Sequence, residues 1–348
     1  MDGLRFLFLG GGTGGHLAPA VGLAEALESR GQKTLFLVNG RPAEAPFLKG
    51  RVAQSLSLEG TRLPRFLALV LGIFRARSHA KAFSPNLVVA LGGAGSVVSL
   101  GLPRRVPRVV LEGNAIPGKA VRLLQLGSRA VLTQFPGPAA GLKNGICVGP
   151  LSRISLRPIP AGEARAKLGL DSARPTLLVV GGSQGADAVN AFAESLIPCL
   201  VDCGGQLLAL VGEGKGKGLR ELCSRGKIAH RVLSHCPDMG AAYSAADLAL
   251  VRGGAATIGE LALFRLPSIV IPYPNHADRQ QYHNASLLGG GTCVLDEPLG
   301  NQETAKVFEI FSSESRREKM RACLEGLAPS DGLAKAVEII EEIASHPF

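Results

Sequence analysis

The sequence contains no tryptophan, and only 5% of its residues are aromatic. Proteins that bind single-stranded nucleic acid stack bases on aromatic side chains, so this shortage argues against a nucleic-acid partner. The formal net charge of +10 at pH 7 would suit either nucleic acid or an anionic membrane surface. Because basic residues flank an apolar segment described below, we expect the membrane surface.

Other features that the sequence lacks exclude further classes of protein. None of the seven cysteines forms a Cys-x-x-Cys pair, which fits reduced thiols in a cytosol and disfavours a zinc site. The longest apolar run, Phe66–Phe74, is far shorter than the ~20 residues of a membrane span. Met1–Leu9 is too short for a signal peptide. The sequence contains no Asp-x-Asp motif, which could hold a divalent metal against a diphosphate. We therefore expect neither a metal nor a cofactor.

Short apolar segments alternate with glycine turns and helical segments along the chain, which is typical of α/β proteins with doubly wound parallel sheets. A proline-rich stretch follows Gly149 and marks a domain boundary. We therefore expect two Rossmann-like domains, over residues 1–152 and 153–331, with a last helix over 332–348 that could pack back on the first. The expected strands are Leu4–Leu9, Lys33–Val38, Leu87–Leu91, Val106–Leu111, Ala130–Thr133, Gly145–Val148, Thr176–Val180, Gln206–Val211, Arg231–Ser234, Asp247–Val251 and Leu266–Ile271.

The first glycine turn, GGGTGGH at 10–16, has the spacing of a dinucleotide-binding fingerprint and precedes a helix expected from about Leu17. That interpretation requires an acidic residue at the end of the next strand, but the strand ends in Asn39-Gly40, so NAD binding is disfavoured. The turn still presents backbone N–H groups to an anion. The helix N-terminus disfavours an imidazolium, so a neutral His16 is a candidate general base; alternatively it only caps the turn.

The stretch from Val251 to Ala285 predicts a nucleotide-sugar site. A turn at Arg252-Gly253-Gly254 precedes a helix over 255–264, whose free N–H groups suit a diphosphate. Glu260 lies farther along this helix, where its carboxylate would repel a phosphate. It can instead accept hydrogen bonds from the two hydroxyls of a ribose. The amides in Asp278-Arg279-Gln280-Gln281 are good partners for sugar hydroxyls. The alternative is an ordinary strand-turn-helix unit with a solvated Glu260.

Residues 61–81 combine an apolar run with basic flanks. Phe66, Val70, Ile73 and Phe74 fall on one helical face, and arginines bracket them. This pattern is typical of a helix that lies on an anionic membrane. A core helix whose arginines extend to solvent explains it equally well.

Five motifs together resemble one family of enzymes, in order and spacing: GGGTGGH at 10–16, LEGNAIPGK at 111–119, GGSQGA at 181–186, RGGAATIGE at 252–260 and DRQQYHNA at 278–285. They are similar to the membrane-associated UDP-N-acetylglucosamine transferases that complete lipid II in bacterial peptidoglycan synthesis (the MurG family). The resemblance implies a GT-B fold, with two domains facing across a cleft. It also implies UDP-N-acetylglucosamine as donor, held mainly by the C-terminal domain. The implied acceptor is undecaprenyl-diphosphoryl-N-acetylmuramoyl-pentapeptide, at the cytoplasmic face of the membrane.

The resemblance assigns roles residue by residue. The matching donor-contacting positions are Thr13, Gly14, Gly15, Asn114, Arg153 and Ser183. Cys236 matches a position whose backbone contacts uracil. The diphosphate and ribose segment is Ala255, Ala256, Thr257, Ile258, Gly259 and Glu260, and the sugar contacts are Gln280 and Gln281. The chain departs from the family at Gly254 and Gly259, where serine is frequent, at Leu111 and Gly113, and at Ala94, where an aromatic residue is usual.

The implied reaction is an inverting glycosyl transfer, with His16 as candidate base. N–H groups around Ser183 and Ala255–Ala256, assisted by Arg153, would hold the leaving diphosphate. A sugar-nucleotide epimerase and a non-catalytic nucleotide-sugar sensor remain alternatives.

Overall fold

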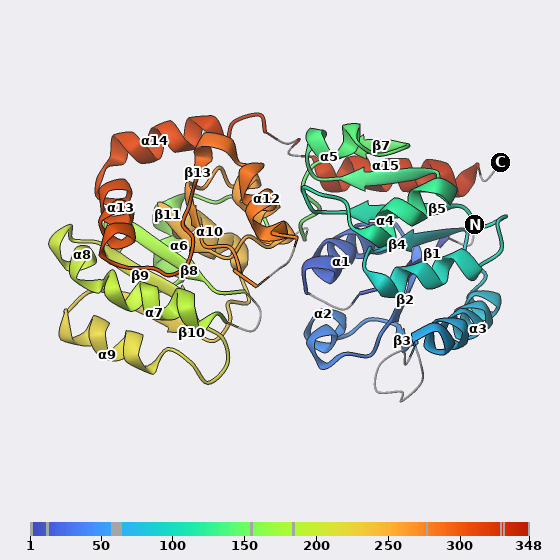
Figure 1. Ribbon diagram of the computed structural model, residues 1–348, viewed down its shortest axis with the longest axis horizontal. Coiled ribbons are helices and arrows are strands. Elements are labelled where there is room, and N and C mark those ends of the chain that lie inside the picture. The colour runs from blue at the N-terminus through green and yellow to red at the C-terminus, as the bar shows by residue number, and fades with distance from the viewer. Residues whose placement is uncertain are drawn as a thin grey trace. The chain divides into compact units, whose positions relative to one another are not determined.

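The computed structural model describes all residues except 1–2, 12–13, 57–64, 154–155, 183–184, 276–277, 328, 330 and 347–348. The chain divides into two compact units, Met1–Ile154 with Ala328–Phe348, and Ser155–Leu327. Each unit is built on one parallel sheet with helices packed against it, as the ribbons in Figure 1 show. The predicted α/β fold class, with two doubly wound parallel sheets, is confirmed.

The first unit contains a seven-stranded sheet in the order β3-β2-β1-β4-β5-β6-β7, in which every neighbouring pair is parallel. Its strands are β1 (Arg5–Leu9), β2 (Lys33–Val38), β3 (Ala53–Ser55), β4 (Leu87–Ala90), β5 (Arg108–Glu112), β6 (Ala130–Thr133) and β7 (Gly145–Cys147). Its helices are α1 (Gly14–Ser29), η1 (Pro42–Glu44), α2 (Ala45–Leu48), α3 (Arg65–Phe83), η2 (Ala94–Gly101), α4 (Lys119–Leu124), η3 (Gln125–Gly127), α5 (Pro136–Ala140) and α15 (Gly332–Ser345).

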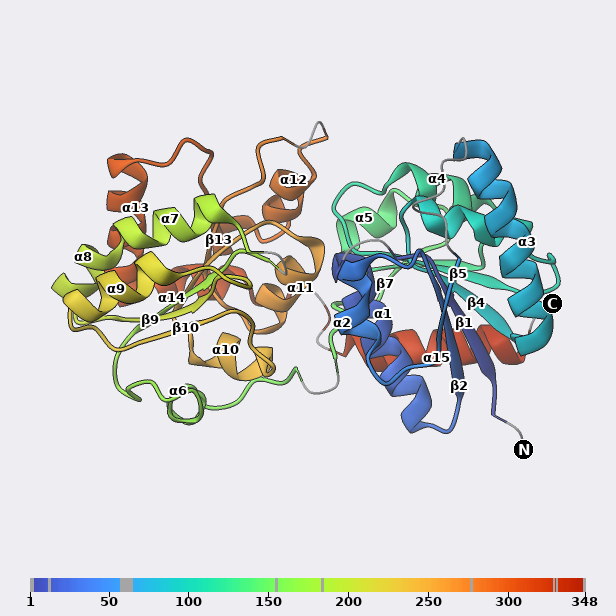
Figure 2. The same ribbon diagram turned by 90° about the horizontal axis from the view of Figure 1, so that it is seen from below.

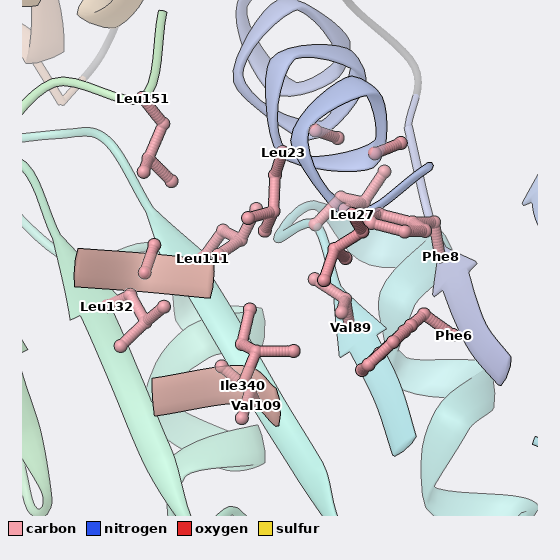
Figure 3. Packing of buried hydrophobic residues seen from close by; sticks show 14 of the residues in the cluster. Phe6, Phe8, Leu23, Leu27, Val89, Val109, Leu111, Leu132, Leu151 and Ile340 are labelled. Atoms are coloured by element: carbon pink, nitrogen blue, oxygen red, sulfur yellow. The ribbon is translucent and has the colours of Figure 1, made fainter. Parts of the chain in front are cut away.

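Both faces of this sheet are buried, because successive side chains of each strand point to opposite faces. Phe6 and Phe8 of β1 pack under α1 and α15, whereas Leu7 and Leu9 pack against α3 and η2. Figure 2 shows α15 and α3 on opposite sides of the strands. Figure 3 shows the first of these clusters at close range, with labelled residues from the strands, α1, the segment after β7 and α15: Phe6, Phe8, Leu23, Leu27, Val89, Val109, Leu111, Leu132, Leu151 and Ile340.

The second unit contains a six-stranded parallel sheet in the order β10-β9-β8-β11-β12-β13. Its strands are β8 (Thr176–Val180), β9 (Gln206–Leu210), β10 (His230–Leu233), β11 (Leu248–Val251), β12 (Ser268–Val270) and β13 (Thr292–Val294). Its helices are α6 (Ala161–Lys167), α7 (Asp187–Ser195), α8 (Ile197–Asp202), α9 (Lys217–Arg225), α10 (Met239–Ala245), α11 (Ala255–Leu263), α12 (Gln280–Ser286), η4 (Gly289–Gly291), α13 (Asn301–Ser312) and α14 (Glu314–Cys323).

Among the differences from the sequence predictions, three concern the region of the candidate site. Helix α1 begins at Gly14 rather than near Leu17, so its first turn contains His16. Strand β5 extends through Glu112, which therefore belongs to the sheet and not to the loop after it. The second glycine turn opens the 3-10 helix η2. No helix in the described part of the chain is long and apolar enough to cross a bilayer.

Candidate functional site

Each sheet has one point at which the strand order reverses, between β1 and β4 in the first unit and between β8 and β11 in the second. Open α/β sheets bind ligands at the carboxyl ends of the strands beside such a point, because the loops there diverge to opposite faces. The loops at these points are the glycine turns after β1, β4, β8 and β11.

In the first unit, His16 lies in the first turn of α1 with its ring against the turn after β4. A Cβ atom at Gly92 would lie 3.4 Å from the imidazole Cδ2 and 3.6 Å from Nε2. Gly92 also has a φ of +73°, which glycine adopts at little cost. Burial lowers the pKa of His16, and the negative charge of Glu112 opposes this effect. The imidazole is therefore neutral at pH 7 and can accept a proton.

Glu112 organises the loop that follows β5. Its Oε1 accepts hydrogen bonds from the backbone N–H of Asn114 at 2.9 Å and from the Asn114 Nδ2 at 2.8 Å. Its Oε2 accepts from the N–H of Gly118 at 2.9 Å. The buried Glu112 carboxylate thus fixes the predicted donor contact Asn114 and also acts electrostatically on His16. The sequence interpretation included Glu112 only as one polar group after a strand and gave it no role.

The remaining predicted residues of the first unit contribute less. Gly14 and Gly15 form the first turn of α1, where their N–H groups have no partner within the helix. Arg153 is half-buried, and its backbone lies against Gly22 in the middle of α1. Thr13 falls outside the described residues.

In the second unit, the N-terminus of α11 lies directly after β11. Gly254 is its N-cap and provides no side chain to satisfy the first N–H groups. The half-buried Ala255 and Ala256 follow it, and their small side chains leave room for an anion at the helix N-terminus, where the helix dipole is positive. Ile258 and Gly259 are buried, so we assign the Ile258 side chain to packing rather than to ligand contact.

Glu260 lies on the second turn of α11, with its carboxylate partly exposed. The hydroxyl of Tyr243, on α10, donates a hydrogen bond of 2.6 Å to Oε2 of Glu260. Tyr243 was not predicted from the sequence, because nothing in a lone tyrosine on a short helix indicates which carboxylate it will meet.

Gln281 lies at the start of α12, and its orientation is set by two backbone groups. Its Oε1 accepts from the N–H of Gly253 at 3.2 Å and from the N–H of Tyr273 at 2.9 Å. A Cβ atom at Gly253 would lie only 2.3 Å from the Gln281 carbonyl oxygen, so only glycine permits this approach. With Oε1 engaged, the side-chain NH₂ of Gln281 is the group that can donate to a sugar hydroxyl.

The second unit therefore brings Gln281 and the start of α11 together at one turn, Arg252–Gly254, and Glu260 follows on the second turn of α11. Arg252 fixes the strand end beside it by donating to the carbonyls of Ile271 and Pro272, both at 3.0 Å, and to Glu297 at 2.8 Å.

Two predicted residues of this unit lie beside that group. Gln280 precedes Gln281, and its N–H donates to Asp278 at 3.3 Å. Cys236 precedes α10, and its thiol donates to the carbonyl of Asp238 at 3.2 Å. Burial raises the pKa of this thiol, so Cys236 is not an activated nucleophile. Ser183 falls outside the described residues, among which no group of three His, Cys, Asp or Glu side chains could hold a metal ion.

Residues 6–133 match the N-terminal domain of glycosyltransferase family 28, and residues 176–335 match its C-terminal domain. The chain is 30% identical over 362 residues to the UDP-N-acetylglucosamine--N-acetylmuramyl-(pentapeptide) pyrophosphoryl-undecaprenol N-acetylglucosamine transferase of Clavibacter michiganensis subsp. michiganensis, with 98% of this chain and 97% of the relative covered. It is 32% identical over 357 residues to the transferase of the same name from Solibacter usitatus, with 97% and 96% covered.

The crystal structure of MurG from Acinetobacter baumannii has the same fold, with a TM-score of 0.76, 23% identity and coverage of 97% of this chain and 99% of that one. The prediction that the chain is a glycosyltransferase is confirmed by these matches. From its similarity to both curated relatives over nearly their whole length, the chain belongs to the family of UDP-N-acetylglucosamine--N-acetylmuramyl-(pentapeptide) pyrophosphoryl-undecaprenol N-acetylglucosamine transferases, within glycosyltransferase family 28.

Proposed function

We propose that the chain transfers N-acetylglucosamine from UDP-N-acetylglucosamine to the C4 hydroxyl of the muramoyl sugar in undecaprenyl-diphosphoryl-N-acetylmuramoyl-pentapeptide. The product is lipid II, the lipid-linked disaccharide used in peptidoglycan synthesis. The observation that carries this proposal is the full-length similarity to two transferases whose names state this donor and this acceptor.

The second unit supplies the donor site in this proposal. The diphosphate binds at the start of α11, where uncapped N–H groups and the positive end of the helix dipole stabilise negative charge. Glu260 accepts hydrogen bonds from the ribose hydroxyls. The NH₂ of Gln281 donates to the sugar, with Gln280 beside it. The backbone at Cys236 faces the uracil. The first unit takes the acceptor, and Asn114 and Arg153 complete the donor contacts.

The reaction inverts the configuration at C1 of the donor sugar. The C4 oxygen of the acceptor forms a bond to C1 while the bond from C1 to the diphosphate oxygen breaks, and UDP leaves with the electron pair. The C4 hydroxyl proton passes to His16, whose lowered pKa keeps it neutral and ready to accept it. The growing negative charge on the diphosphate is stabilised by N–H groups at Ala255 and Ala256, together with those around Ser183.

The first unit also docks on an anionic membrane surface, at the cytoplasmic face where the lipid-linked acceptor is presented. Helix α3 contacts η2, and η2 contacts α4, so the three elements form one surface. Large apolar side chains on these elements and on η3 are exposed to solvent: Leu67, Phe74, Leu100, Leu123 and Leu126. Exposed basic residues lie among them: Lys81, Arg104, Arg105, Lys119, Arg122 and Arg129. Apolar side chains that enter the interface and cations that attract anionic lipid act together at such surfaces.

An assay of UDP release tests the proposal. The protein is incubated with UDP-N-acetylglucosamine, with and without a lipid-linked muramoyl acceptor. We expect UDP release that requires the acceptor, with an N-acetylglucosaminyl group on C4 of the muramoyl sugar. Release without the acceptor, a change in the donor sugar alone, or nucleotide binding without turnover would each contradict the proposed transfer. The second outcome would indicate an epimerase and the third a nucleotide-sugar sensor.

A further inference from the structure

The side chain of Tyr243, on α10, connects this helix to α11, which carries Glu260. Its ring is buried, with 2% of its surface exposed, and packs against Phe264 at a centroid distance of 5.2 Å. Its hydroxyl donates to Glu260 Oε2 at 2.6 Å. A hydrogen bond of this length to a carboxylate is of the strong, charge-assisted kind.

The helix that carries Tyr243 is held at both ends. At its start, Asp238 caps α10 by accepting a hydrogen bond from the N–H of Ala241 at 2.9 Å. At its end, the buried Arg165 donates to the carbonyl of Ala245 at 3.0 Å and to Asp247 at 2.7 Å. The position of the phenol is therefore determined by the frame of α10 and β11, and does not depend on a ligand.

The phenol remains a hydrogen-bond donor at all physiological pH values. Burial and the adjacent charge of Glu260 raise the pKa of Tyr243 well above its usual value. An ionised carboxylate offers about four acceptor positions, so accepting from Tyr243 does not by itself prevent the carboxylate from accepting from a diol. What the phenol restricts is rotation of the carboxylate, because only one orientation keeps Oε2 on the Tyr243 hydroxyl.

We propose that Tyr243 is a positioning residue for the nucleotide: its hydroxyl holds the Glu260 carboxylate in the orientation in which it accepts hydrogen bonds from the ribose hydroxyls. This inference rests on the proposed function, in which Glu260 binds the ribose. Tyr243 itself does not touch the ligand. Preorganisation of this kind improves affinity because the carboxylate does not lose rotational freedom when the ligand binds.

The test compares the affinities of UDP and 2′-deoxy-UDP in the wild-type protein and in Tyr243→Phe. Tyr243→Phe removes the hydroxyl and keeps the ring. The wild-type protein should prefer UDP by about tenfold, because the deoxy ligand lacks one hydrogen bond to a charged group. In Tyr243→Phe, we expect this preference to fall below about threefold and the KM for the UDP-sugar to rise several-fold, with little change in kcat.

A merely structural role for Tyr243 would weaken both ligands equally and leave their ratio unchanged. Phe264→Leu is the matched control, because it loosens the packing around the phenol ring but keeps the hydroxyl. The ratio of its affinities for UDP and 2′-deoxy-UDP should remain that of the wild type. A wild-type ratio in Tyr243→Phe would overturn the inference. If Tyr243→Phe does not fold, Tyr243→Met replaces it, because it also removes the hydroxyl and fills the same space with an apolar side chain; the ratio should again fall, and an unchanged ratio would likewise overturn the inference.

Glu260→Ala separates this inference from the proposed function. If Glu260→Ala leaves UDP affinity unchanged, the ribose assignment itself fails. If Glu260→Ala weakens UDP binding while Tyr243→Phe keeps the wild-type ratio, only the positioning role fails. In the double variant Tyr243→Phe, Glu260→Ala, we expect no loss beyond that of Glu260→Ala alone, because the phenol then has no carboxylate to position.

Discussion

His16 has the two properties that a general base requires at neutral pH. It lies in the first turn of α1, at the carboxyl edge of the sheet, and its pKa is lowered by burial. We expect His16→Ala to lower kcat by about 10²- to 10⁴-fold, the usual contribution of a positioned base. UDP affinity, measured by titration calorimetry, should change little. A loss of activity under tenfold would remove His16 from this role.

The pH dependence of kcat/KM tests the same role of His16 as a general base. His16 acts in its neutral form, so activity should fall as the pH drops through its pKa, which lies below the ordinary value of 6.5. The profile should therefore be flat on its acid side down to pH 7. Glu112→Gln removes the negative charge of Glu112, which raises the pKa of His16, so the acid limb should move to lower pH. A limb that moves to higher pH, or that persists in His16→Ala, would contradict the assignment.

Glu260 provides the test on the donor side. We expect Glu260→Ala to weaken UDP binding by about 10- to 100-fold, because a hydrogen bond to a charged group contributes roughly 1.5–3 kcal/mol. Glu260→Gln is the conservative control, since the amide oxygen can still accept from Tyr243 and from one hydroxyl. The loss of UDP affinity should be smaller in Glu260→Gln than in Glu260→Ala. Both values come from calorimetric titration with UDP, and an unchanged affinity in Glu260→Ala would refute the ribose contact.

The sequence predicts the local placement of single residues where a short pattern determines it. A helix N-terminus after a glycine turn is local, and so His16 and Ala255 lie where the pattern indicates. The partners that tune these residues are not local. Glu112 is far from His16 in sequence, and Tyr243 meets Glu260 only because α10 and α11 belong to one folded unit. No periodicity or motif in the sequence contains this pairing.

Helix α3 shows the same limit at the scale of an element. The sequence pattern groups Ile73 and Phe74 on one apolar face and leaves a membrane helix and a core helix as equal alternatives. In the folded unit Ile73 packs into the core, against Gly101, whereas Phe74 is 62% exposed. Arg75 and Arg77 donate to the backbone carbonyls of Leu56 and Gly101. One face of the helix therefore belongs to the core, and the opposite face carries exposed apolar residues.

This division makes the membrane proposal testable with matched variants. We expect Leu67→Ser, Phe74→Ser to reduce binding to anionic vesicles several-fold in a sedimentation assay, with no change in Tm, because both side chains are exposed. Wild-type binding should also weaken as salt screens the basic residues.

The control for this pair is Ile73→Ala. It should lower the free energy of unfolding by about 2–4 kcal/mol, as expected when a packed aliphatic side chain is truncated, and leave vesicle binding of the folded protein unchanged. Equal vesicle binding by the wild type and the double serine variant would show that the docking surface lies elsewhere.

At the scale of the whole molecule, both units have the same sheet topology. In each unit the strand order reverses beside the first strand, and glycine turns follow the strands at that point. The strands follow from apolar runs between glycine turns, which is why their positions are predictable. The last helix, which the sequence suggested could pack back on the first unit, is α15, and it packs on α1 through Ala336, Val337 and Ile340. The residues that it meets follow from no local pattern, because this contact joins the two ends of the sequence.

The most direct test of the account is the crystal structure of the protein with UDP bound. The account predicts the diphosphate at the N-terminus of α11, over Ala255 and Ala256, and the ribose hydroxyls on the carboxylate of Glu260 with Tyr243 still bonded to Oε2. A nucleotide found away from Glu260 and from the Arg252–Gly254 turn would contradict it.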